Sequence, residues 1–243
     1  MLPPNIKQRS SDPELMDAED CDKMLLHKTL VQFERINRFI TPSRRLMRKH
    51  FLSRMQQSPD REWTLLDIGA GGGDLALWLA QEARRRSLNL KITCLDLDRF
   101  TSNFASERCQ DWGEIETVCG DMFEYCPERK WDFVYSNHVL HHLDWDQLKQ
   151  AISLVDCISV EHFALVDLHR NHLSYYGYTL LAAVFLRGSF AFHDGRVSIR
   201  KAFFRSELQQ IVQSEQWKDI EVQLSPPGHL VVQRTSGHNH KTS

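Results

Sequence analysis

The sequence predicts an α/β fold, doubly wound around one mostly parallel sheet. Short apolar segments alternate with helical stretches such as 74–86 from residue 61 onward, a pattern typical of parallel strands flanked by helices. The apolar segments lie at 64–68, 91–95, 115–118, 132–136 and 162–167. Near the end of the chain KDIEVQLS and HLVVQR are separated by PPG, which predicts two antiparallel strands joined by a tight turn. We therefore expect seven strands, with an antiparallel hairpin last.

Composition limits the class of protein. The 243 residues, 42% of them hydrophobic, suffice for one core with an appended cap. A net charge of -2 disfavours nonspecific nucleic-acid binding, because such binders carry a clearly basic face. No apolar run approaches the roughly eighteen residues of a membrane span, and the start of the chain has no apolar signal core. The six cysteines form no CxxC pair, so we expect reduced thiols, no metal and a cytoplasmic location.

Residues 1–60 are predicted to form a helical arm that packs on a domain at 61–235. Apolar residues recur at helical spacing between Asp22 and Ile40, and Pro42 ends that helix. A second helix is predicted over SRRLMRKHFLSRM. A short helix is expected before Asp22, with Asp12 as its cap and Pro13 at its first position.

Two further segments depart from the alternation of strands and helices. Residues 170–204 form an insertion after the fifth strand. Its part at 172–192 is rich in Tyr, Leu and Phe and is followed by HDGRVSIRKAF, in which we expect a glycine turn. Residues 236–243 are polar and are expected to be a flexible tail.

The stretch LLDIGAGGGDLALWLA at 65–80 places an acid at a strand end and glycines at the start of a helix. This is a Rossmann-like nucleotide loop, but the NAD fingerprint GxGxxG is broken because Asp74 stands where its third glycine belongs. The pattern Asp67-x-Gly69-x-Gly71-x-Gly73 resembles instead the class I S-adenosylmethionine-dependent methyltransferases.

Three companion motifs follow in the order of that family, and the resemblance covers about residues 61–235. KITCLDLD ends its strand at Asp96, VCGDMFEY supplies Asp121, and WDFVYSNHVLHHL supplies Asn137. The resemblance implies S-adenosylmethionine as cofactor, bound by residues at the carboxyl ends of the strands, where open α/β sheets bind ligands. Its implied contacts are Asp67, Gly69 and Gly71 at the methionine part, Asp96 at the ribose, Asp121 and Met122 at adenine, and Asn137 near the methyl group, with Leu97 as a further cofactor-binding residue.

The residues themselves agree with a cationic cofactor. An acid-lined site suits a sulfonium and an ammonium group, whereas a phosphate cradle would benefit from a nearby Lys or Arg, and GAGGGDLALWLA has none. Asp98 is expected to cap the following helix rather than to bind the ribose.

Methyl transfer is an in-line displacement, in which a base is optional and helps when the acceptor is a phenol. The candidate bases are His138, His141, His142, His169 and His193, of which we favour His142 and His169 because both follow strands. The HVLHH run lacks the glutamate of the metalloprotease HExxH, because position 139 is Val.

The acceptor is expected to be a small hydrophobic molecule. Methyltransferases of adenine or glutamine carry an Asn/Asp-Pro-Pro-aromatic box where this chain reads SNHV, and no Pro-Cys nucleophile for cytosine is present. The arm and HDGRVSIRKAFFRSEL look similar to bacterial methyltransferases that accompany polyketide synthases, in which such an arm closes over the cofactor, here with Phe33, Asn37 and Arg38. The prediction is O-methylation of a phenolic, quinol or polyketide-like compound. An NAD-dependent oxidoreductase and a non-catalytic binding protein with the same fold stay as alternatives, and the sequence leaves O-, N- or C-methylation and the oligomeric state open.

Overall fold

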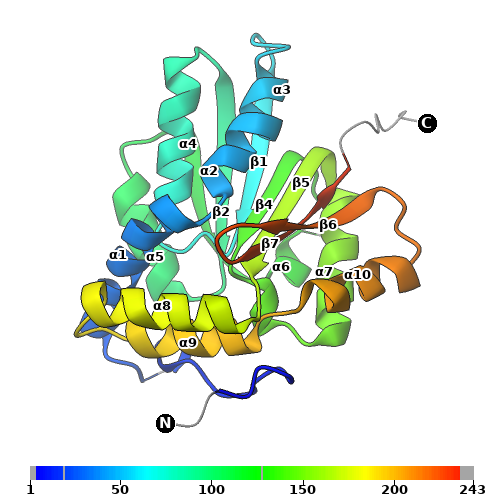
Figure 1. The fold of residues 1–243 in the computed structure, drawn as a ribbon. Helices are drawn as coiled ribbons and strands as arrows, with labels where there is room; N and C mark the ends of the chain where they lie inside the picture. Colours follow the sequence, from blue (N-terminus) through cyan, green and yellow to red (C-terminus); the bar gives the residue numbers. More distant parts are fainter. Residues whose placement is uncertain (1–3, 19, 127, 236–243) are drawn as a thin grey trace.

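The computed structural model describes residues 4–18, 20–126 and 128–235, which surround a seven-stranded sheet (Figure 1). The strand order is β3-β2-β1-β4-β5-β7-β6. Strands β1 to β5 pair in parallel, while β7 is antiparallel to both β5 and β6. The strands are β1 Glu62–Ile68, β2 Asn89–Asp96, β3 Ile115–Cys119, β4 Trp131–Asn137, β5 Ser159–Leu168, β6 Ile220–Ser225 and β7 His229–Arg234. The predicted fold, including the final hairpin, is confirmed.

Helices cover both faces of this sheet. The α-helices are α1 Lys23–Ile40, α2 Ser43–Leu46, α3 Ser53–Met55, α4 Asp74–Arg85, α5 Arg99–Cys109, α6 Met122–Tyr125, α7 Trp145–Ile158, α8 His172–Phe185, α9 Ala191–Lys201 and α10 Arg205–Ser214. Successive strand residues point to opposite faces, so Leu65 joins the core beneath α4 and the segment from α2 to α3, whereas Leu66 joins the core beneath α6, α7 and α10. Shorter elements are the 3₁₀ turns η1 Leu15–Asp17 and η3 Leu140–His142 and the π-helical segment η2 Met47–Leu52.

The arm follows its predicted helices except at the beginning. Asp22 caps α1 by accepting from the backbone N–H groups of Met24 and Leu25, and α2, η2 and α3 follow one another directly as a second helical segment. The predicted Asp12 cap is wrong, because η1 begins at Leu15 and Asp12 instead pairs with Arg200 at 2.8 Å.

The insertion forms two helices, α8 and α9, that lie side by side (Figure 1). The expected glycine turn is wrong, because Gly195 lies inside α9. A Cβ at Gly195 would stand 2.2 Å from the ring of Tyr178, so this position requires glycine for close helix packing.

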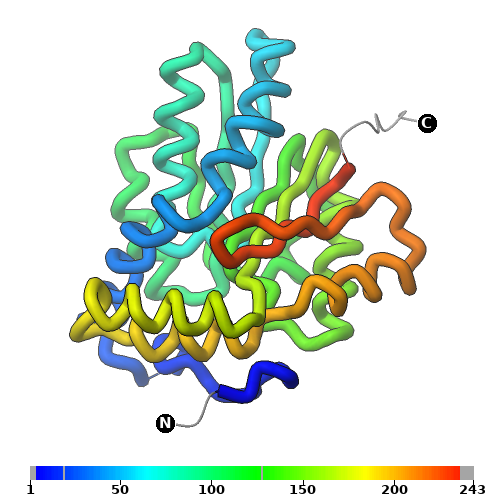
Figure 2. Tube along the Cα trace, in the orientation of Figure 1, coloured from blue at the N-terminus to red at the C-terminus, as the bar shows by residue number. Residues whose placement is uncertain are grey.

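The arm and the insertion meet at the carboxyl edge of the sheet, far apart in sequence but adjacent in space (Figure 2). The Ser10 N–H donates to the Arg200 carbonyl at 3.0 Å, and buried Arg170 donates to the Ile6 carbonyl at 2.7 Å. The 236–243 tail lies outside the described residues. None of the helices within the described ranges is long and apolar enough to cross a bilayer.

Candidate active site

A cavity of about 1000 Å³ lies at the carboxyl ends of β1, β2 and β4 and is lined by the arm and the insertion as well as by the strand ends. All the residues predicted to bind the cofactor line it: Asp67, Gly69, Gly71, Asp96, Leu97, Asp121, Met122 and Asn137. The sequence motifs, spread over seventy-one positions, therefore converge on one cavity.

The glycine loop is held by the strand that follows it. Gly69 has φ +67°, and a Cβ there would lie 2.2 Å from Cγ2 of Val139, so both its backbone and its neighbour require glycine. The Gly71 N–H donates to Oδ2 of Asp96 at 2.9 Å. Asp96 thus lines the cavity, as the sequence predicts, and also holds the glycine loop. Its position in the sequence did not indicate this second role.

Three carboxyl groups make this end of the cavity suited to a cation. Burial, followed by the charges of Asp74 and Asp96, raises the pKa of Asp67 well above its usual value. Burial likewise raises the pKa of Asp74 and of Asp96, although N–H groups such as that of Gly71 oppose the rise at Asp96. A positively charged ligand relieves this crowding of acids, whereas a phosphate would add to it. Oδ1 of Asn137 is also buried with no hydrogen-bond partner among the described atoms.

Two aspartates here begin helices. Asp98 caps α5 by accepting from the Thr101 N–H at 2.8 Å, as the sequence predicts. Asp121 caps α6 by accepting from the Phe123 N–H with Oδ1 at 2.8 Å, and the carboxyl group also lines the cavity. An adenine contact would therefore have to share Asp121 with this helix cap.

Of the two histidines favoured as bases from the sequence, His142 lines the cavity and His169 does not, among the described residues. His142 lines the cavity, with Nδ1 3.5 Å from Oδ2 of Asp17, while burial and then the charge of His141 lower its pKa to about 3. His169 is not among the described residues that line the cavity, and its Nδ1 lies 2.9 Å from Nδ2 of Asn171.

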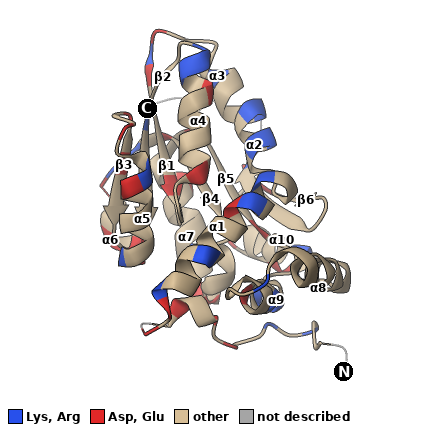
Figure 3. Ribbon diagram, turned by 90° about the vertical axis from the view of Figure 1, so that its left-hand side faces the viewer, with Lys and Arg blue, Asp and Glu red and all other residues tan. Residues whose placement is uncertain are grey.

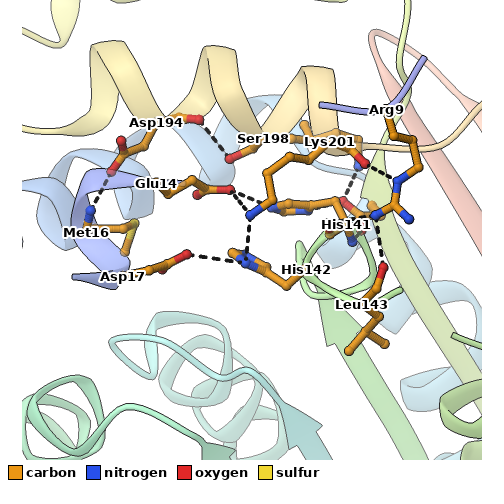
Figure 4. A network of polar contacts seen from close by, with 12 residues as sticks. Arg9, Glu14, Met16, Asp17, His141, His142, Leu143, Asp194, Ser198 and Lys201 are labelled. Atoms are coloured by element: carbon orange, nitrogen blue, oxygen red, sulfur yellow. Dashed lines mark hydrogen bonds and ion pairs between the residues drawn. The ribbon is translucent and has the colours of Figure 1, made fainter. Parts of the chain in front are cut away.

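His141 occupies the centre of a buried polar network (Figure 4). Its Nδ1 lies 2.8 Å from Oδ1 of Asp167, and its backbone N–H donates to Oδ2 of the same carboxylate at 2.6 Å. Its Nε2 lies 3.6 Å from Oε1 of Glu14, which the arm brings in from the other end of the chain. Neither Nε2 nor Oε1 has a hydrogen-bond partner among the described atoms, and both residues line the cavity.

The charges of this network reinforce one another. Burial alone would lower the pKa of His141, but the charge and hydrogen bond of Asp167, and then Glu14, raise it to about 9. Burial would raise the pKa of Glu14, but His141 and the neighbouring cations lower it to about 2. The imidazole is therefore a strong base held between two carboxylates.

Glu14, His141 and His142 offer one ligand atom each within 4.8 Å of one another, so they have the donors of a metal site. The ammonium group of Lys201 is in the same place, 3.2 Å from Oε1 of Glu14 and 3.5 Å from Nδ1 of His142. The absence of a metal remains a prediction.

Sequence reasoning missed the partners that surround His141. Asp167 ends a predicted strand, as Asp67 and Asp96 do, and this position was a usable signal. No local pattern marks Glu14 or Lys201, because their roles depend on how the arm and α9 fold together.

The sequence of residues 65–157, which include the glycine loop and His141, matches a family model described as a methyltransferase domain. This match covers less than half of the chain. A tRNA1(Val) (adenine(37)-N6)-methyltransferase from Enterobacter is 37% identical over 78 residues, which are 30% of this chain and 31% of that protein. A malonyl-[acyl-carrier protein] O-methyltransferase from Ilyobacter polytropus is 26% identical over 106 residues, which are 42% of this chain and 38% of that protein. The matches thus span about a third of the length of these curated relatives.

Solved methyltransferases share the fold over most of the chain. The plantazolicin methyltransferase BpumL, in complex with SAH, superposes with a TM-score of 0.59 at 12% identity and covers 88% of this chain and 96% of its own. The magnesium protoporphyrin IX methyltransferase from Synechocystis PCC 6803, with bound SAH, gives a TM-score of 0.55 at 13% identity and covers 91% of both chains. The predicted Rossmann-like fold is thus shared with solved methyltransferases, and the match at 65–157 agrees with the predicted family. The S-adenosylmethionine-dependent activity and the cofactor stay predictions.

Proposed function

We propose that this protein transfers a methyl group from S-adenosylmethionine to a small hydrophobic acceptor, at a phenolic or enolic oxygen. The observation that carries the proposal is the continuity of the cavity. Its acidic end holds the glycine loop, and its other end is lined by apolar side chains such as Phe33, Ile36 and Ile40 of α1. A volume of about 1000 Å³ lies at the upper end of the range of small-molecule sites, enough for cofactor and acceptor together.

The bound cofactor supplies a methyl group activated on a positively charged sulfur. Asp67 and Asp96 would hold its cationic and hydroxyl groups, because the buried Asp67 and the half-buried Asp96 both line the cavity. Arg44, which lines the cavity beside Asp74 with its guanidinium 5.1 Å from the ring centre of Trp78, is the cation suited to the cofactor's carboxylate. Asn137, with its unpartnered buried oxygen, would sit nearest the methyl group.

We place the general base at His141. Above about pH 9 the neutral ring can accept the acceptor's proton at Nε2, while Asp167 holds the opposite ring nitrogen and stabilises the imidazolium that forms. A pKa of about 9 is close to the value near 10 of a phenol, so transfer of the proton from the phenol to the ring costs only about 1.4 kcal/mol. His142 stays a candidate at the cavity wall. His169 would have to act from outside the cavity lining.

The wall of the cavity favours a small acceptor over nucleic acid. The Enterobacter relative is named for adenine in tRNA, but this chain reads SNHV at 136–139, and the arm adds Glu14 and Asp17 to the cavity. Carboxylates in the wall of the cavity oppose entry of a phosphate backbone. A cytoplasmic location remains the expectation.

The proposal is tested by isothermal titration with S-adenosylhomocysteine, with NADH as control ligand. One-site binding of S-adenosylhomocysteine alone is expected, and phenols and quinols are then screened as acceptors by mass spectrometry. Binding of NADH instead would support the oxidoreductase alternative. Binding of S-adenosylhomocysteine without turnover of any phenol, enol, amine or carbon acid would support a binding protein with this fold.

A further inference from the structure

The outer face of α8 is an exposed apolar surface. We call its five large side chains the α8 stripe: Leu173 is 79% exposed, Tyr176 50%, Leu180 71%, Val184 58% and Phe185 71%. The buried residues Tyr175 and Ala182 lie on the opposite face of the helix. A helix packed against a domain normally presents polar residues to water. The packing of α8 on its own domain therefore does not account for the apolar residues on its outer face.

Charge is absent from the stripe and concentrated around it. Residues 172–185 contain no Asp, Glu, Lys or Arg, so the α8 ribbon is tan along its length in Figure 3, whereas the ribbon near α2 and α3 has blue positions for Lys and Arg. At the end of α8, Arg187 is exposed, and the Lys28 ammonium lies close enough to Gly188 to stand 2.8 Å from a Cβ built there.

A second basic group lies beside the start of α8. Arg45 donates to Oγ of Ser225 at 2.9 Å, and in the same turn a Cβ at Gly228 would lie 2.7 Å from Oγ of Ser174 in α8. In the same helical segment as Arg45, Lys49 is exposed. Cationic side chains thus lie near both ends of α8.

We propose that the α8 stripe docks the protein on the surface of a bilayer that contains anionic lipids. A helix of 14 residues is about 21 Å long, shorter than the roughly 30 Å hydrocarbon core, so α8 lies in the interface and does not cross it. Apolar side chains enter the boundary between headgroups and acyl chains, and the flanking Lys and Arg meet anionic headgroups. A folded protein partner would need polar groups to match its own, and the stripe offers only the phenol of Tyr176.

The inner face of α8 connects this surface with the cavity. Tyr178 lines the cavity, and Ala182 and Leu186 pack in one cluster with Ile36 and Phe33 of α1. One helix therefore separates the bilayer from the apolar end of the cavity, and an acceptor dissolved in the membrane has a short route to it. Docking itself goes beyond the proposed function, whereas acceptor delivery rests on it.

Docking is tested by co-sedimentation of the full chain with vesicles of phosphatidylcholine, with and without phosphatidylglycerol. The wild type is expected to bind the vesicles that contain phosphatidylglycerol. Leu180→Asp should lower the partition coefficient about tenfold or more, because a leucine's burial is lost and a charge is added. Val160→Asp is the matched control, because Val160 is exposed at the opposite edge of the sheet, at the start of β5.

Each variant is also titrated with S-adenosylhomocysteine, so that loss of fold or of cofactor binding is seen separately from loss of docking. A wild type that stays in the supernatant with both vesicles overturns the proposal, as does an unchanged partition of Leu180→Asp. Light scattering adds a third outcome: a dimer that Leu180→Asp abolishes, without vesicle binding, would assign the stripe to a second copy of the chain.

Discussion

His141 should make the stability of this protein depend on alkaline pH. The ring is buried between Asp167 and Glu14, and, although burial opposes it, these two carboxylates raise its pKa from 6.5 to about 9. The folded protein therefore keeps a proton that the unfolded chain releases. The stabilisation is complete below pH 6.5 and is lost as the pH rises through 9.

The difference between 6.5 and about 9 corresponds to about 3 kcal/mol of unfolding free energy. The low pKa of Glu14, about 2, describes the same contact from the other partner and is not added to it. The lowered pKa of Glu14 affects stability only at acidic pH, where the stabilisation from this carboxylate is lost as the pH falls from 4.5 toward 2. A loss of about 3 kcal/mol is large beside the total of about 5–15 kcal/mol typical of a domain.

Urea denaturation at several pH values between 6.5 and 9.5 measures this effect in the wild type and in His141→Gln. The wild type should lose about 3 kcal/mol more than the variant over this range, because glutamine has no proton to release. Titration of the other groups is common to both proteins and cancels. Parallel stability curves for the two proteins would refute the charged His141 network.

Three further changes test other parts of the structure. Asp96→Asn should weaken S-adenosylhomocysteine binding by about 1–3 kcal/mol in calorimetry, because the carboxylate both faces the cavity and holds the glycine loop. Gly195→Ala should cost about 1–3 kcal/mol in urea denaturation, because its Cβ would stand 2.2 Å from Tyr178. Burial lowers the pKa of His162 to about 3, so between pH 6.5 and pH 5 the wild type should lose about 2 kcal/mol more than His162→Gln in urea denaturation. The losses from His138, His142 and His229, whose pKa values are also lowered, are common to both proteins.

Matched variants accompany the first two of these changes. Asp98→Asn should keep its affinity for S-adenosylhomocysteine, because Asp98 caps α5; a loss equal to that of Asp96→Asn would place the ribose at both residues. Gly177→Ala in α8 meets nothing within 4 Å and should be neutral or stabilising by up to about 1 kcal/mol. Equal destabilisation by Gly177→Ala and Gly195→Ala would contradict the packing argument.

The sheet and the cofactor end of the site could be predicted because their signals are local. Asp67, Asp96 and Asn137 each end an apolar strand, and the carboxyl ends of parallel strands share one edge. The alternating pattern gives the strands, and the strands bring the motifs together. Even the role of Asp98 as a helix cap followed from its position.

The acceptor end could not be predicted in this way, because no single segment forms it. Asp194 of α9 accepts from the N–H groups of Leu15 and Met16, both at 2.9 Å, so a residue almost 180 positions away takes the role expected of Asp12. Gly195, expected in a turn, is a packing residue for the same reason: Tyr178 of the neighbouring helix determines what fits there.

These contacts also connect the position of the arm with the chemistry of His141. Arg9 donates to the carbonyls of His141 and Leu143, and Asp194 holds η1, so the same contacts that fasten the arm bring Glu14 against the ring. With the arm in place, two carboxylates raise the pKa of His141; with the arm displaced, only Asp167 would remain. The basicity of the proposed catalytic residue is therefore set in part by a segment that no strand-end motif includes, so a displaced arm would change both the lining of the cavity and the pKa of His141.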